Sequence, residues 1–126
     1  MRWCWLLLLP VLLWPALSLA QCPGVTTQLT PYAKETLVIA STATALTPSI
    51  YQPPGQSPAL AQLTVEGGDI RYQVVGNPTI ALGHHVPGSP PQQLTICGLA
   101  SIQQFRAIAI AANASITATY YRPRSP

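Results

Sequence analysis

Few residues of this chain have the types and spacing that catalysis or metal binding requires. His84 and His85 are adjacent, and neighbouring residues on a strand point to opposite faces, so their rings would not converge on one metal ion. Glu66 and Asp69 lie three positions apart, but acid–base hydrolysis needs a cleft that holds one carboxyl in an apolar pocket, and these two flank a predicted turn. No serine stands in a nucleophile-elbow pattern, and no glycine run matches a phosphate-binding loop. We therefore expect no catalytic residue, no metal site, no cofactor and no enzyme activity.

The composition favours short strands over long helices. Only 7% of the 126 residues are charged, against about 25% in an average globular protein. Fourteen prolines and many Thr, Ser, Gln and Ala residues take the place of the Glu, Lys and Arg that the solvent faces of helices need. The net charge of +3 comes from scattered basic residues, whereas nucleic-acid binding needs them in clusters. We therefore expect one small β-rich domain with no nucleic-acid partner.

Residues 1–20 have the pattern of a secretory signal peptide. Arg2 precedes an apolar run, and the segment Ser18-Leu19-Ala20 carries small residues at its first and third positions, as cleavage sites do. Cleavage after Ala20 would leave Gln21 as the mature amino terminus. We therefore expect a secreted or extracytoplasmic protein that has no stable membrane insertion once the leader is removed.

Two other interpretations of the leader stay open. The apolar run is near the lower length limit for spanning a bilayer, so a retained anchor is the first alternative, although Pro10 and Pro15 argue against it. A lipoprotein signal is the second alternative because Cys22 lies close to the cleavage point. Gln21, however, stands where lipid-modified cysteines usually have a small residue before them.

Removal of the leader also removes Cys4 and leaves Cys22 and Cys97 as a pair. In an exported small domain, an even number of cysteines indicates a disulfide. The bond would tie the mature amino terminus to a late strand and close a loop of about 75 residues, which the chain-entropy model values at about 4 kcal/mol. Two free thiols are the alternative.

Gly67 and Gly68 separate two runs in which apolar and polar residues alternate. Because glycine adopts positive φ without steric cost, the pair suits the two-residue loop of a tight β-hairpin. In the resulting register all large apolar residues fall on one face, with these pairs opposite each other: Val65 and Ile70, Leu63 and Tyr72. The pattern therefore predicts a hairpin that turns at Gly67-Gly68.

The remaining strand candidates are short and lie between Pro- and Gly-rich turns. They cover residues 35–41, 79–86 and 93–98, and a last hairpin pairs 105–110 with 115–121. Residues 42–51 contain a proline and are predicted to be an edge strand or an irregular connection, and 99–104 to be one helical turn. The sum is an all-β fold, an antiparallel β-sandwich or jelly-roll-like domain of seven or eight short strands. We place it at residues 35–122, between an N-terminal lead-in at 21–34 and a flexible tail at 123–126.

Several residues are candidates for surface contacts. Tyr120 and Tyr121 must point to opposite faces of a strand, so one of them can serve as an anchor for a partner. Arg71, Tyr72 and Arg106 complete the set of candidate interface residues. In addition, the segment 113–115 matches the glycosylation acceptor pattern and lies in a predicted loop.

Short motifs from Asp69 onward form a recognisable series. They are Ile70-Arg71-Tyr72, Gly76-Asn77-Pro78-Thr79, Gly83, Leu94-Thr95 with Gly98, Phe105-Arg106-Ala107-Ile108 and Tyr120-Tyr121. Over about residues 69–121 this series resembles small bacteriophage virion-associated proteins of the decoration or head-fibre type. The resemblance implies a β-sandwich with an assembly role on a particle and no catalytic residues. The leader departs from it, because phage particles assemble in the cytoplasm.

These observations favour a non-enzymatic, exported structural or assembly protein. Low charge, open edge strands and Thr-rich faces suit lateral packing against other protein subunits, in a homo-oligomer or on a particle, filament or cell surface. The alternative is a monomeric secreted binding module that recognises a glycan or peptide through the Pro-rich loops around Pro53-Pro54 and Pro90-Pro91.

Overall fold

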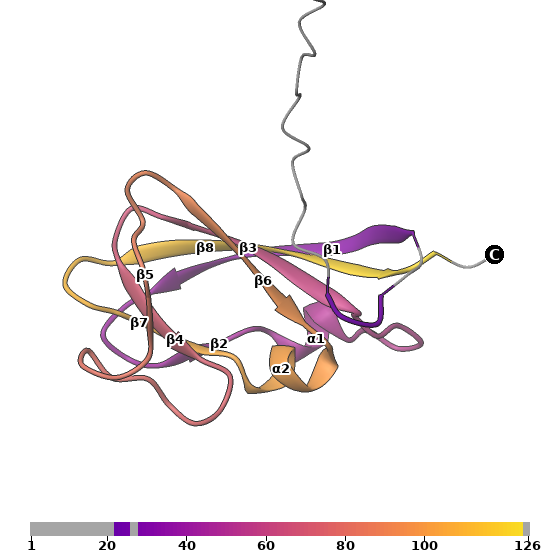
Figure 1. Ribbon diagram of the computed structural model, residues 1–126, viewed down its shortest axis with the longest axis horizontal. Coiled ribbons are helices and arrows are strands. Elements are labelled where there is room, and N and C mark those ends of the chain that lie inside the picture. Colours follow the sequence, from indigo (N-terminus) through magenta and orange to yellow (C-terminus); the bar gives the residue numbers. More distant parts are fainter. Residues whose placement is uncertain (1–21, 26–27, 125–126) are drawn as a thin grey trace, which may run out of the picture.

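Two antiparallel sheets of four strands each pack face to face in the computed structural model, which describes residues 22–25 and 28–124 (Figure 1). The first sheet has the strand order β1-β8-β3-β6 and the second the order β2-β7-β4-β5. The elements in chain order are β1 (Leu29–Ile39), β2 (Thr44–Ala45), α1 (Pro48–Tyr51), β3 (Leu60–Glu66), β4 (Ile70–Gln73), β5 (His84–Val86), β6 (Gln92–Cys97), α2 (Leu99–Gln104), β7 (Arg106–Ala109) and β8 (Ala114–Pro123). The predicted all-β fold of short antiparallel strands is confirmed.

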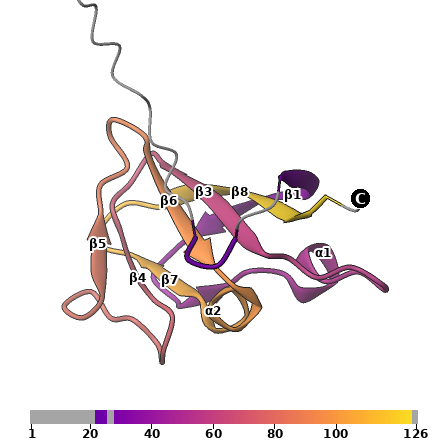
Figure 2. The same ribbon diagram turned by 45° about the vertical axis from the view of Figure 1, so that its right-hand side comes forward.

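Strict alternation along β3 and β8 builds the core between the two sheets. Both strands lie in the middle of the first sheet, and every second residue of each is buried. The second sheet supplies the facing layer, and α1 and α2 cover the end of the sandwich near the carboxyl terminus (Figure 2). The largest fully buried side chains come from both layers and from α2: Tyr120, Phe105, Ile39, Leu63, Ile70, Ile102, Ile116 and Val65. Because each strand has one apolar face, burial of these faces against each other is the main stabilising term.

One carboxylate lies within this core. Glu35 on β1 is only 7% exposed, and its Oε1 accepts hydrogen bonds from the Tyr120 hydroxyl and from the Thr47 amide, the latter at 3.1 Å. Burial, and then the hydrogen bond to Glu35, raise the pKa of Tyr120 well above its usual range. The Tyr120 hydroxyl is thus held in its neutral form, and it fixes β1 to β8 from inside the sandwich.

The predicted disulfide between Cys22 and Cys97 is present, with an S–S distance of 2.03 Å. It joins the first described residue to the end of β6. Strand β1 starts at Leu29, inside the predicted lead-in, because Leu29 pairs with Pro123 of β8. The predicted signal peptide, residues 1–20, lies outside the described residues.

The predicted hairpin at Gly67-Gly68 is wrong. Strand β3 pairs with β8 and β6 in the first sheet, whereas β4 pairs with β5 and β7 in the second. The two glycines therefore carry the chain from one sheet to the other, and Gly67 adopts a φ of 84° in doing so. The last predicted hairpin fails in the same way, since β7 belongs to the second sheet and β8 to the first.

The physical reason is that alternation determines which side chains point inward but not which strand lies alongside. A short turn between two alternating strands can keep both in one sheet or pass the chain to the facing sheet. In both arrangements the apolar faces end in the same core.

A substitution at Gly68 tests this crossover. A Cβ added there would lie 2.5 Å from the Ala112 carbonyl oxygen and 2.9 Å from that of Asn113, so we expect Gly68→Ala to destabilise the fold by about 1–3 kcal/mol in urea unfolding. Ser57→Ala, at an exposed loop position, is the control and should stay within about 0.5 kcal/mol of the native stability. A Gly68→Ala protein as stable as the native one would contradict the crossover, because a hairpin would leave that Cβ in solvent.

Candidate functional site

The loop between β4 and β5, residues 74–83, exposes an unusual amount of apolar surface. Val75 is 75% exposed, Ile80 61% and Leu82 58%. Within the described part of the chain, these are three of the four large apolar side chains that are strongly exposed; the fourth is Val38 on β1. Several large apolar groups gathered on one loop of a small domain typically mark a surface that contacts another molecule.

Arg71 on β4 holds this loop in place. Its Nε donates a hydrogen bond to the Ile80 carbonyl at 2.9 Å, and its Nη1 donates one to the Gly83 carbonyl, also at 2.9 Å. We predicted Arg71 as a candidate interface residue. The structure instead directs its guanidinium to the backbone of the loop, with two of its donors on two separate carbonyls.

A turn at Thr79 adds local order. The Thr79 amide donates to the Leu82 carbonyl at 2.9 Å, and the Leu82 amide donates to the Thr79 hydroxyl at 3.0 Å. Gly83 closes the loop at a φ of 126°, where an added Cβ would lie 3.0 Å from the Tyr72 carbonyl oxygen. Ile80 and Leu82 are therefore presented by a preformed loop, and binding through them needs little additional ordering.

The other candidate interface residues have different positions. Tyr72 is half-buried, and its ring lies 5.6 Å from that of Phe105 and 5.2 Å from that of His84. Arg106 donates hydrogen bonds to the carbonyls of Gln103 and Phe105, at the end of α2.

Tyr120 is completely buried, so it is excluded as an interface residue. Tyr121 points to the outer face, as the predicted alternation requires, and its hydroxyl donates to Gln62 Oε1 at 3.2 Å. Asn113 of the glycosylation pattern is exposed in the connection between β7 and β8. Of the tyrosine pair, only Tyr121 can meet a partner.

A second polar cluster joins β4 and β5 towards the end of the strand pair that is away from the loop. Asp69 Oδ2 lies 3.0 Å from His85 Nε2, and Asp69 Oδ1 accepts a hydrogen bond from the Gly88 amide at 3.1 Å. These two contacts, the Gly88 amide first, lower the pKa of Asp69. The contact between Asp69 and His85 was not predicted from the sequence. It depends on the pairing of Ile70 with Val86, and nothing in the sequence pattern shows which strand lies beside β4.

The two histidines point in different directions, one to the Tyr72 ring and the other to Asp69. Among residues 22–25 and 28–124, no group of three or more His, Cys, Asp or Glu side chains is placed to hold a metal ion. In the same residues, no helix is long and apolar enough to cross a membrane. The exposed side chains of Val75, Ile80 and Leu82 make the loop 74–83 the candidate functional site.

Replacement of Arg71 should free the loop while leaving the sandwich folded. In Arg71→Met both hydrogen bonds to the loop are lost, and we expect global stability to fall by about 1–2 kcal/mol. Cleavage within residues 76–83 in limited proteolysis should become at least about tenfold faster, because local opening of the loop then needs less free energy. Arg106→Met is the matched control, since it removes a guanidinium that contacts α2. Equal protection of the loop in both variants would show that Arg71 does not order it.

The Asp69 cluster should contribute to stability in a pH-dependent way. Because the pKa of Asp69 is lowered in the fold, its contribution is present above the ordinary aspartate value of about 3.9 and is lost as the pH falls through the lower, folded value. We expect Asp69→Asn to be less stable than the native protein in urea unfolding at neutral pH, with the difference shrinking towards pH 2. Glu66→Gln removes an equal charge from a nearby exposed position and serves as the control. A difference that did not depend on pH would contradict this role.

No protein-family model, no curated protein and no solved structure matches this chain.

Proposed function

We propose that this protein is a non-enzymatic, exported structural or assembly protein: a β-sandwich subunit that packs against other protein subunits on a particle, filament or cell surface. The observation that carries the proposal is the apolar loop, with Val75, Ile80 and Leu82 exposed on a backbone that Arg71 and Thr79 hold in shape. An exposed apolar group on an ordered loop is costly in solvent and is stabilised when a partner covers it.

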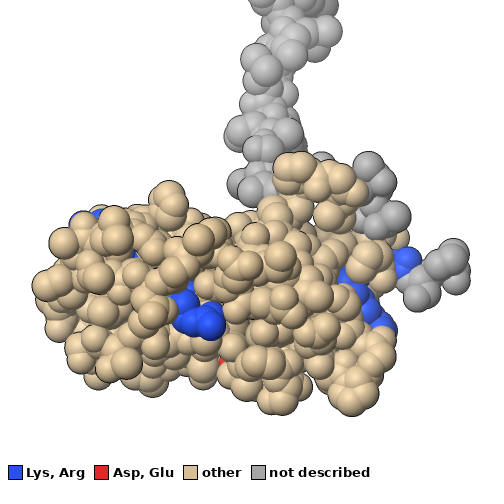
Figure 3. Space-filling model, turned by 90° about the horizontal axis from the view of Figure 1, so that it is seen from below, with Lys and Arg blue, Asp and Glu red and all other residues tan. Residues whose placement is uncertain are grey.

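The distribution of charge supports packing over binding of an ionic ligand. The face of the molecule that carries the second sheet shows a few separate Lys and Arg side chains and very little acidic surface (Figure 3). A face with few charges lowers the desolvation penalty of a protein contact, because few ionic groups must lose water.

The amino-terminal pattern and the disulfide support an extracytoplasmic compartment. A secretory leader would carry the chain to an oxidising environment, where the bond between Cys22 and Cys97 forms and persists. The resemblance of residues 69–121 to virion-associated proteins fits an assembly role. On this proposal the β-sandwich serves the same kind of role outside the cytoplasm.

The test replaces the three apolar side chains of the loop together, as V75S/I80S/L82S. Each side chain that a partner covers contributes about 1–2 kcal/mol, so the fraction of secreted protein that co-sediments with large particles or filaments should fall at least about tenfold. Arg71 and Thr79 remain in place, so circular dichroism and thermal unfolding should stay close to those of the native protein.

The control variant, P53S/P54S, changes the Pro-rich loop instead. It should leave sedimentation unchanged if the proposal is right. Native protein found only as a small, unassembled species would refute the proposal, and loss of a bound glycan or peptide in P53S/P54S alone would establish the binding-module alternative.

A further inference from the structure

Most side chains on the outer face of the first sheet are polar and uncharged; the exceptions include Val38, Lys34 and Glu66. Residues that pair between neighbouring strands present their side chains on the same face, which gives two complete rows across the sheet. The rows are Thr36, Thr117, Thr64 and Gln93, and Lys34, Thr119, Gln62 and Thr95. Hydrogen bonds connect the face internally, including Thr36 Oγ1 to Thr117 Oγ1 at 3.4 Å and Gln62 Nε2 to Gln93 Oε1 at 3.5 Å. Both contacts are long, so they connect neighbouring strands across this face only weakly.

Two exposed charges of opposite sign lie diagonally across this array. Lys34 on β1 is opposite Thr119 of β8, and Glu66 on β3 is opposite Ser115 of β8. Strand β8 lies between β1 and β3, and Thr117 is midway between positions 115 and 119. Thr117 therefore marks the midpoint between Lys34 and Glu66, which standard strand spacing places about 16 Å apart.

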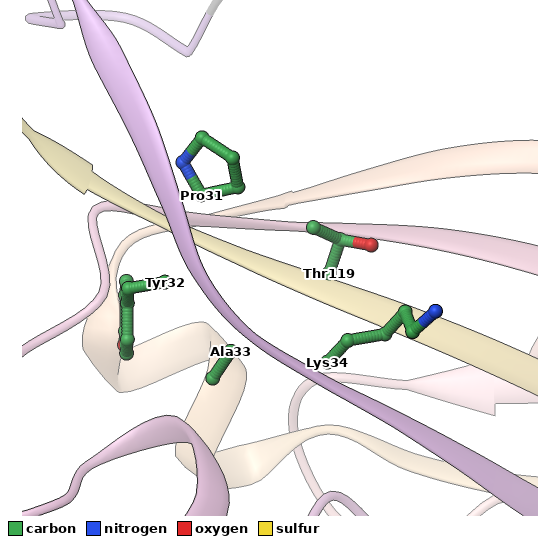
Figure 4. Close-up of a pocket in the computed structure, with 5 residues that line it drawn as sticks. All are labelled: Pro31, Tyr32, Ala33, Lys34 and Thr119. Carbon is green, nitrogen blue, oxygen red and sulfur yellow. The ribbon is translucent and has the colours of Figure 1, made fainter.

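A shallow hollow lies beside Lys34, where β1 has a bulge between Pro31 and Ala33. Figure 4 shows Pro31, Thr119 and Lys34 on one side of β1, with Tyr32 and Ala33 on the other. A carboxylate entering from the outer face would meet the Lys34 ammonium group and the Thr119 hydroxyl. Lys34 and Thr119 thus offer an acidic side chain two polar contacts at the rim of an open hollow that is otherwise lined by Pro31, Tyr32 and Ala33.

We propose that the partner of this face is a second copy of the chain. Consider a two-fold axis that lies between the two copies, parallel to the sheet, and passes over Thr117 at right angles to the line from Lys34 to Glu66. Rotation about this axis places Lys34 of one copy over Glu66 of the other. The Glu66 side chain of each copy then lies over the Lys34 hollow of the other, and Thr117 meets its own counterpart on the axis. Such an isologous contact is closed, and it forms the same ion pair twice.

The area and the charges set the strength of this dimer. Four strands at standard spacing, each about 20 Å long, give a face of about 400 Å² per copy, which is about half of what each partner buries in a standard stable interface. An exposed ion pair contributes about 1 kcal/mol or less. The dimer is therefore weak, dependent on concentration and loosened by salt. The apolar loop belongs to the second sheet, so the dimer leaves both loops uncovered on its two outer sides.

Charge reversal with rescue tests the pairing in the purified, oxidised protein. Sedimentation velocity over a concentration series should give a monomer–dimer equilibrium for the native chain. K34E and E66K should each raise the dissociation constant about tenfold, since each places like charges in contact at both ends of the interface. The double variant K34E/E66K restores opposite charges and should return the constant to near the native value.

A substitution on the axis gives a second readout. T117R places two arginines against each other and should abolish the dimer, whereas T42R adds the same charge in the exposed connection after β1 and should not. The loop variant V75S/I80S/L82S should keep the native dissociation constant, so failure of the assembly proposal can be recognised separately. A native chain that stays monomeric throughout the series would refute the dimer, as would a double variant no better than the single ones.

Discussion

The structure depends on one constraint: every strand has a single apolar face, and two sheets must cover these faces together. In the central strands β3 and β8 every second residue is buried, and the second sheet lies across them. Since a sheet in water cannot leave such a face exposed, the chain passes between layers at Gly67-Gly68 and again between β7 and β8. Val75, Ile80 and Leu82 of the loop 74–83 are not part of this core, and they are available for contacts.

The same constraint explains how much could be predicted from the sequence. Alternation and turn residues located most strands and the helical turn at 99–104, and the pair of cysteines outside the predicted leader indicated the disulfide. They could not distinguish a hairpin from a crossover, because Val65 and Ile70 enter the same core in both arrangements. The buried position of Glu35 was within reach, since it stands at even spacing from Leu37 and Ile39 on one face of β1. Its partner Tyr120 was not, because that contact depends on the pairing of β1 with β8.

The candidate site was hidden for a different reason. Val75, Ile80 and Leu82 look like core residues in the sequence, and only the strand boundaries show that they fall in a loop. Arg71 stands on an alternating strand, where a polar residue normally faces solvent without a specific partner. Its contacts with the Ile80 and Gly83 carbonyls depend on the path of a ten-residue loop, 74–83, which no local pattern determines.

Four of the nine charged residues of this chain have structural contacts. Arg71 orders a loop, Arg106 contacts the end of α2, Asp69 joins β4 to β5, and Glu35 lies in the core. Lys34 and Glu66 are exposed on one face with no structural contact of this kind, and the rows between them are uncharged. An ionic group on an otherwise neutral surface has a large influence on orientation, because no neighbouring charge screens or competes with it. Two such groups of opposite sign, placed symmetrically about Thr117, can therefore select one way of packing two copies, even though the hydroxyl and amide groups around them favour none.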